Sequence, residues 1–139
     1  MLQSEINAIL ERKVYEWAQA NGEIVLYDNL SNASPPADQP YLRMFVEPGD
    51  SIWSGNAQGP EVRRTGMLSI QIFALEDQGW LGATSLVDSF IRHLEYWPRY
   101  DSPDRAEAKT LTLKQAMPDR VGNDNGRYQY NVYFPYSGD

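Results

Sequence analysis

Cysteine is absent from this chain of 139 residues, and histidine occurs once, at His93. Without cysteine the chain has no disulfide, no thiolate metal ligand and no cysteine nucleophile. A single histidine would need two or three carboxylates to complete a zinc site, and no suitable spacing of carboxylates surrounds His93. The sequence therefore predicts no metal and no cofactor, and it favours a boundary position for His93 near the end of a helix.

Positive charge is also scarce. The chain carries 12 Lys and Arg against 19 Asp and Glu, which gives a net charge of −7. Binding to a nucleic-acid backbone needs a positive surface that displaces counterions, so this balance argues against non-specific DNA or RNA binding. The net negative charge concentrates in residues 22–62, where six acidic residues stand against Arg43 as the single basic residue. We interpret this region either as ordinary solvated surface or as an acidic rim that faces a molecule which must pass without binding, such as DNA.

Long apolar runs are missing as well. No stretch of 18 apolar residues occurs, so no membrane span is expected, and the N-terminal residues lack the features of a secretion signal. Hydrophobic residues make up 42% of the chain and charged residues 22%, as in ordinary globular domains. The length suits one domain with one core, and we expect a single domain over residues 1–139.

Apolar periodicity predicts two helices. The first ends at Asn21-Gly22 and the second spans about 79–96. Short apolar or alternating runs predict strands at 24–27, 41–48, 63–75, 110–114 and 127–136, with long loops near 28–40, 47–63 and 99–109. The expected fold class is α+β: a mostly antiparallel or mixed sheet of about five strands, with two main helices packed on one face. The apolar positions of the first helix are Leu2, Ile6, Ile9, Leu10, Val14 and Trp17.

The junction at Gly79-Trp80-Leu81-Gly82 separates a strand from a helix, as phosphate-binding loops do. It lacks the Lys and the following Ser or Thr of a Walker loop and the third glycine of a dinucleotide fingerprint. The acidic pair Glu76-Asp77 before it would repel a phosphate. We therefore interpret Gly79 and Gly82 as structural: Gly79 lets the chain turn, and Gly82 lets the start of the helix pack closely.

Catalytic patterns are likewise missing from the sequence. The few carboxylate pairs fall in predicted loops, no serine has a nucleophile-elbow context, and Asp124-Asn125-Gly126 is typical of a turn. Trp53 falls in a predicted long loop, where tryptophan is seldom exposed without a reason. It either folds back onto the sheet or meets a partner. The aromatic content favours a protein that takes part in assembly over an enzyme.

Four segments in this order resemble the tail terminator (tail-completion) proteins of long-tailed bacteriophages, the minor tail protein U family. They are an N-terminal amphipathic helix with the loop YDNLSNASPP, the strand YLRMFVEPGD, the strand-to-helix segment RRTGMLSIQIFALEDQGWLGATSLVDSF, and the closing strand GRYQYNVYFPYSGD. The resemblance covers nearly the whole chain. Its most specific parts are Tyr41-Leu42-Arg43 and the run from Gly66 through Phe90.

The resemblance implies a structural role without catalysis. Such proteins form a hexameric ring on the finished tail tube, stop its growth and offer a surface for joining the head. The implied partners are further copies of the chain, the tail tube protein and a head–neck connector protein, in the virion tail of a phage assembled in the bacterial cytoplasm. The free protein is then either a ring already or a monomer that assembles on the tube, and DNA passes the lumen without specific binding.

Candidate interface or lumen residues follow from this implied role. An acidic lining would let DNA pass, and Glu47, Asp50 and Glu61 flank the predicted 47–63 loop. Arg63 and Arg64 are candidates for pairing with an acidic tube or neighbour, because arginine forms bidentate ion pairs, and Trp53 is a further candidate. Plain surface charge is the alternative for both charged sets. Other readings of the whole chain are another phage neck or connector protein, a host adaptor domain, or a small enzyme that uses His93 and loop carboxylates.

Overall fold

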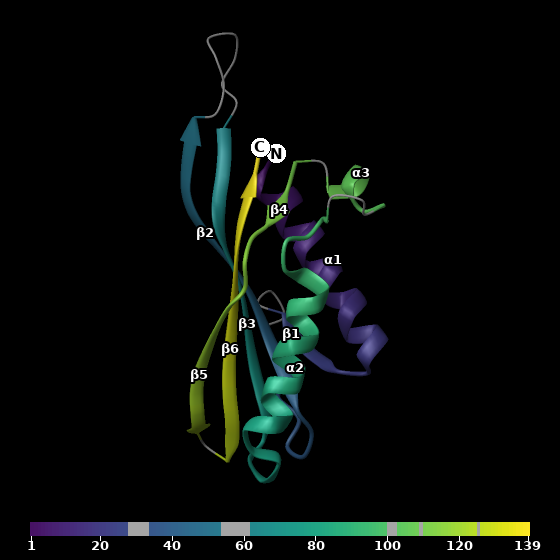
Figure 1. The fold of residues 1–139 in the computed structure, drawn as a ribbon, viewed down its shortest axis with the longest axis vertical. Helices are drawn as coiled ribbons and strands as arrows, with labels where there is room; N and C mark the ends of the chain where they lie inside the picture. The colour runs from purple at the N-terminus through teal and green to yellow at the C-terminus, as the bar shows by residue number, and fades with distance from the viewer. Residues whose placement is uncertain (28–33, 54–61, 100–102, 109, 125) are drawn as a thin grey trace.

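The structure is a computed structural model that describes residues 1–27, 34–53, 62–99, 103–108, 110–124 and 126–139. Its elements are α1 (Gln3–Asn21), β1 (Ile24–Tyr27), β2 (Tyr41–Trp53), β3 (Val62–Leu75), the 3-10 turn η1 (Glu76–Gln78), α2 (Gly79–Leu94), α3 (Arg105–Ala108), β4 (Thr112–Leu113), β5 (Met117–Asp124) and β6 (Arg127–Gly138). The sheet lies on one side, and α1 and α2 cover one of its faces (Figure 1). The predicted α+β fold with a mixed sheet is confirmed.

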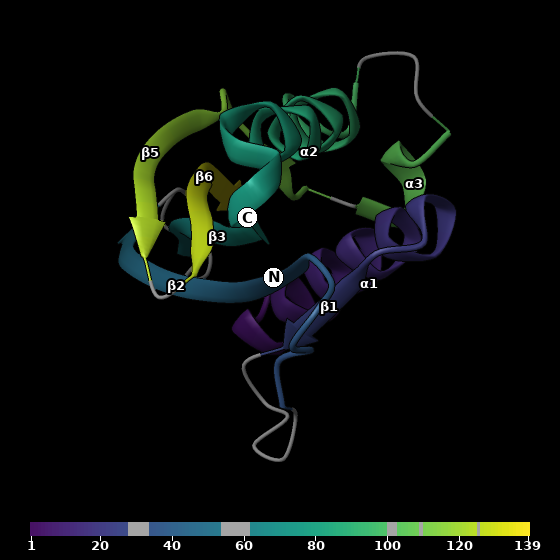
Figure 2. The same ribbon diagram turned by 90° about the horizontal axis from the view of Figure 1, so that it is seen from below.

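The six strands pair in the order β1-β2-β3-β6-β4, and β5 pairs with β6. Only the β1–β2 pair is parallel, with Ile24 opposite Tyr41, and the other pairs of described strands are antiparallel. The sheet is twisted and curled, as the view along its long axis shows (Figure 2). Its centre is formed by β3 and β6, which pair along the whole length of β6, from Leu75–Arg127 to Arg64–Gly138.

Strand β5 was not among the predicted strands. Its sequence MPDRVGND is polar, contains proline and shows no apolar alternation, so no periodic signal marks it. It pairs with β6 alone, and an edge strand does not need apolar residues on both faces. The predicted turn at Asp124-Asn125-Gly126 connects β5 to β6, and Asn125 lies outside the described residues.

The prediction of a loop over 47–63 was wrong at both ends. Strand β2 continues to Trp53, and β3 begins at Val62. The pairing register shifts between Pro48 and Ser51, so the strand passes the Pro48-Gly49 pair through a bulge instead of ending there. The predicted loop at 99–109 contains the short helix α3, and only Thr112 and Leu113 of the predicted 110–114 strand are paired.

Helix α1 is capped at both ends. The Glu5 carboxylate accepts a hydrogen bond from the Leu2 backbone N–H (2.8 Å), and Gly22 ends the helix in the left-handed region (φ +65°), as predicted. Leu2, predicted on the apolar face, precedes the first turn and is 61% exposed, so that part of the prediction was wrong. At the start of α2, Gly79 has φ +58°, which confirms its predicted role as a turning residue.

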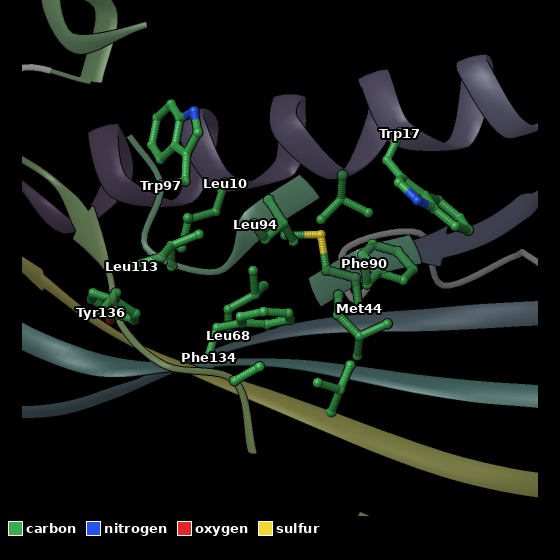
Figure 3. Close-up of a cluster of buried hydrophobic side chains, with 14 of the residues drawn as sticks. Leu10, Trp17, Met44, Leu68, Phe90, Leu94, Trp97, Leu113, Phe134 and Tyr136 are labelled. Carbon is green, nitrogen blue, oxygen red and sulfur yellow. The ribbon is translucent and has the colours of Figure 1, made fainter. Parts of the chain in front are cut away.

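The core lies between the helices and the sheet (Figure 3). The Trp17 and Phe90 rings stack at 3.9 Å between centroids and join α1 to α2, while the Trp17 Nε1–H donates to the Ser89 hydroxyl (2.9 Å). Every second residue along the strands points toward the helices and supplies the other wall of the core. They are Leu42, Met44, Leu68, Ile70, Ile72, Val132, Phe134 and Tyr136. Alternation therefore places the intervening residues of β2, β3 and β6 on the face that carries no helix.

Candidate assembly surfaces

Strands β2 and β3 continue past the end of β6. Gly138 is the last β6 residue paired with β3, opposite Arg64, whereas β2 and β3 still pair at Ile52–Arg63 and Trp53–Val62. We call residues 50–53 and 62–65 the hairpin end. It projects beyond the helices and lies near both ends of the chain (Figure 1). The last pairs of this hairpin lack the third strand that covers the rest of β3, so their outer edges are open.

The two predicted arginines lie at the hairpin end. Arg63 Nε donates to Asp139 Oδ1 at 2.8 Å, and both side chains are largely exposed. This bond raises the pKa of Arg63 and lowers the pKa of the Asp139 carboxyl. Arg64 Nε donates to the Met1 carbonyl (3.1 Å). Water competes with the exposed Arg63–Asp139 contact, so an acidic partner could replace Asp139 at little cost. The pairing of both arginines with a neighbour stays a prediction.

The predicted acidic residues fall on the same hairpin. Glu47 is exposed on β2 and accepts a weak hydrogen bond from the Ser69 hydroxyl (3.3 Å). Asp50 is also exposed, and its backbone carbonyl accepts from the Thr65 hydroxyl (2.7 Å). Glu61 and the side chain of Trp53 lie outside the described residues. The structure thus brings Glu47, Asp50 and the two arginines onto two paired strands, and a lining role for the carboxylates stays a prediction.

The sheet face that carries no helix is rich in aromatic residues and side-chain amides. We call it the helix-free face. By alternation and strand register it carries Tyr41, Arg43, Phe45, Glu47, Ser69, Gln71, Phe73, Asp119, Gln129, Asn131 and Tyr133. Tyr41, Ser69 and Asn131 are buried, and no residue at the centre of the face is fully exposed. Gln129 donates to the Asn131 side-chain oxygen (3.1 Å), and Asn131 donates to the Tyr133 hydroxyl (3.2 Å). Solvated sheet faces are usually polar, so this composition sets the face apart.

Two arginines lie over the rings of this face. Tyr41 and Phe73 stack at 4.7 Å, and the Arg43 guanidinium lies 6.0 Å and 5.9 Å from their centroids. Arg127 lies 5.0 Å from the Tyr41 ring, and it also donates to the backbone carbonyls of Pro36 and Gln39. The sequence analysis did not select Arg43 as a site residue. Its alternation with Tyr41 and Phe45 is the signal that could have indicated it.

A buried polar cluster joins α1, the end of α2 and the region of α3. Lys13 is 6% exposed, and its Nζ contacts Glu16 (2.9 Å) and Asp104 (3.2 Å). The Trp97 indole N–H also donates to Asp104 (2.9 Å). His93 Nε2 lies 3.0 Å from the Lys13 carbonyl, and burial lowers the pKa of this histidine. The contacts tie three segments together, so the cluster has a structural explanation.

Exposed apolar side chains mark the start of α2. Trp80 is 63% exposed and Leu81 is 62% exposed. Periodicity would place Trp80 in the core, because it lies three residues before the buried Ala83 on the same helix face. It lies instead in the first turn, at the lower end of the molecule (Figure 1). Large apolar side chains this exposed are typical of contact sites.

Within the described residues, His, Asp and Glu form no group that could hold a metal ion, and no helix is long and apolar enough to cross a membrane. No protein-family model matches the chain, and no curated protein matches it. A solved structure whose name describes no function is similar to it over all of this chain and 96% of that one, with 19% identity and a TM-score of 0.73. At that identity the similarity shows a shared fold and nothing further.

Proposed function

We propose that this protein is a phage tail terminator, which caps the finished tail tube as a ring, stops its growth and presents a surface for joining the head. The observation that carries the proposal is the resemblance of four segments, in the same order, across nearly the whole chain. The α+β fold supports it, because a mixed or antiparallel sheet with helices on one side is what the resemblance implies. A fold alone hosts many functions, so the sequence segments carry more weight.

The distribution of exposed groups also supports a ring. A closed ring of identical subunits uses head-to-tail contacts, in which two different surfaces of each copy meet. The chain offers distinct surfaces of this kind: the hairpin end, the helix-free face and the exposed apolar start of α2. A net charge of −7 suits a ring through which DNA passes without binding.

The test is a tube-growth assay. Tail tube protein is allowed to polymerise with and without this protein, and tube lengths and end structures are measured by electron microscopy. We expect shorter tubes whose ends carry a ring, and sedimentation should show six copies in that ring. Tubes that grow to the same length with bare ends would contradict the proposal. Binding to a head–neck connector with tube growth unchanged would assign the protein to another neck role.

A further inference from the structure

Among the described residues, Arg43 has no acidic partner for its charge. Its Nε is buried, and among the described residues it has no hydrogen-bond acceptor. No described carboxylate forms a salt bridge with Arg43, and its guanidinium group lies beside the Tyr41 and Phe73 rings. A guanidinium is a strong donor of paired hydrogen bonds to carboxylates. Arg43 is partly exposed beside the Tyr41 and Phe73 rings, so its guanidinium group can donate to a carboxylate from outside.

The residues around Arg43 are those that protein interfaces favour. Aromatic residues, methionine and arginine are enriched at the centres of interfaces, where lysine and acidic residues are depleted. Phe45 lies beside Arg43 on this face, and Arg127 adds a second guanidinium above Tyr41. Side-chain amides of Gln71 and Asn131 continue the row across β3 and β6. The helix-free face is therefore an aromatic and partly buried surface. It carries two guanidinium groups, and it also carries the carboxylates of Glu47 and Asp119.

The opposite kind of surface occurs where β3 passes into α2. Glu76 and Asp77 are exposed in η1, and they form no ion pair with another described residue. Trp80 and Leu81, more than three-fifths exposed, follow in the first turn of α2. We call these four residues the α2 tip. It presents two carboxylates beside two large apolar side chains, which complements a surface of guanidinium groups and aromatic rings in both charge and hydrophobicity.

We propose that the α2 tip of one copy docks on the helix-free face of the next copy, with Arg43 paired to Glu76 or Asp77 and Trp80 against the aromatic residues. A head-to-tail contact of this kind, in which two different surfaces meet, suits a closed ring. The inference rests on the proposed ring, of which it names the contact between neighbours. Nucleic acid is the less suitable occupant, because the chain carries a net charge of −7.

A charge-swap experiment tests this contact. Sedimentation and chemical cross-linking measure self-association of the full chain, alone and on tail tubes. The variants are Arg43→Glu, the double variant Glu76→Arg/Asp77→Arg, and the triple variant that combines them. We expect each of the first two to weaken self-association by roughly tenfold or more, and the triple variant to recover most of it. Arg92→Glu changes the charge equally at an exposed position on α2 and should assemble as the wild type does.

Thermal unfolding shows whether each variant folds, and Arg43→Gln replaces Arg43→Glu if the latter does not. Wild-type assembly by folded Arg43 variants overturns the inference, and so does a folded triple variant without recovery. Absence of self-association under all conditions, or Arg43-dependent binding of single-stranded DNA in its place, overturns it too. Tube length is measured separately. If the wild type caps tubes but the Arg43 variants self-associate normally, the proposed contact is wrong and the proposed function stands. If the charge swap restores self-association but the protein does not cap tubes, the contact stands and the proposed function is wrong.

Discussion

Gly66 lies in β3 between two neighbouring strands, opposite Pro48 of β2 and Tyr136 of β6. A methyl group added to its Cα would lie 2.4 Å from the Tyr136 hydroxyl and 2.5 Å from the Glu47 carbonyl oxygen. Both neighbours are held in place, Glu47 by strand pairing and Tyr136 by its burial and a hydrogen bond from Gln3 (3.0 Å). Gly66 begins one of the most specific segments of the resemblance, and the structure supplies a steric reason for a glycine at this position.

We predict that Gly66→Ala lowers the free energy of unfolding by about 1–3 kcal/mol, because the strand must shift to admit the methyl group. Urea denaturation followed by circular dichroism measures the change. Gly82→Ala is the matched control: its added methyl would meet only Gln78, with the Cβ and the side-chain oxygen at 3.1 Å, and alanine favours the helix. The control should cost clearly less stability than Gly66→Ala. Equal stability of the two variants would contradict the steric explanation.

His93 makes stability depend on pH. Burial lowers its pKa below the usual value of 6.5, although the hydrogen bond to Lys13 opposes this. The unfolded chain therefore takes up a proton at a higher pH than the folded chain does. The stability contribution is complete above about pH 6.5 and is lost as the pH falls through the folded pKa. Lys13, Glu16 and Asp104 are the charged groups around it.

We predict that the melting temperature falls between pH 7.5 and pH 5, and that His93→Gln reduces this fall because glutamine cannot take up a proton. Differential scanning calorimetry at a series of pH values provides the measurement. Asp104 has a pKa below its usual value of 3.8, so its protonation affects stability in a separate and more acidic range. An equally steep fall in His93→Gln would assign the pH dependence to other groups.

At the scale of elements, the two main helices are joined through one aromatic contact. Trp17 and Phe90 stack at 3.9 Å, and both are almost completely buried. Their positions on the apolar stripes follow from periods of three and four residues, so their burial could be predicted from the sequence. Their contact could not, because it depends on how two helices distant in the chain pack on the same sheet face.

We predict that Phe90→Ala destabilises the protein by about 3–5 kcal/mol, because it removes a large ring from the core and leaves a cavity. Trp80→Ala removes a larger aromatic side chain that is 63% exposed, and it should change stability by no more than about 0.5 kcal/mol. Both are measured by chemical denaturation. A large loss in Trp80→Ala would mean that this residue is part of the fold rather than free for a partner.

For the whole molecule, the hairpin end and the two ends of the chain form one exposed region. Arg63 contacts Asp139, and Arg64 contacts Met1, so residues from the start, middle and end of the chain meet there. Such a region is suited to contact a tube or a neck partner, which is the role the resemblance implies for one face of the ring.

We predict that the double variant Arg63→Glu/Arg64→Glu folds but needs at least roughly tenfold more protein to stop tube growth, because two guanidinium groups are lost to the acidic partner. Tube length as a function of protein concentration is the readout. A double variant with Arg92→Glu and Arg99→Glu, both exposed at the other end of α2, matches the charge change. Normal capping by Arg63→Glu/Arg64→Glu would exclude these residues from the tube contact.

The sequence by itself determined the elements with strong periodicity: α1, β1, β3, α2, β6 and the beginning of β2. Their apolar patterns decide which face is buried, and local signals such as Gly22 and Gly79 decide where they begin or end. The absence of cysteine and the acidic balance also limited the classes of function without any structure. These properties depend on residues close together in the chain, which is why sequence reasoning reaches them.

The tertiary structure decided what depends on pairing between distant segments. Strand β5 exists because the edge of β6 offers hydrogen bonds to a polar sequence, and β2 passes Pro48-Gly49 because a bulge preserves its pairing with β3. The contact of Arg43 with the Phe73 ring of another strand and the contact of Arg63 with Asp139 arise in the same way. Long-range hydrogen bonding and packing set these features, and no local pattern in the chain encodes them.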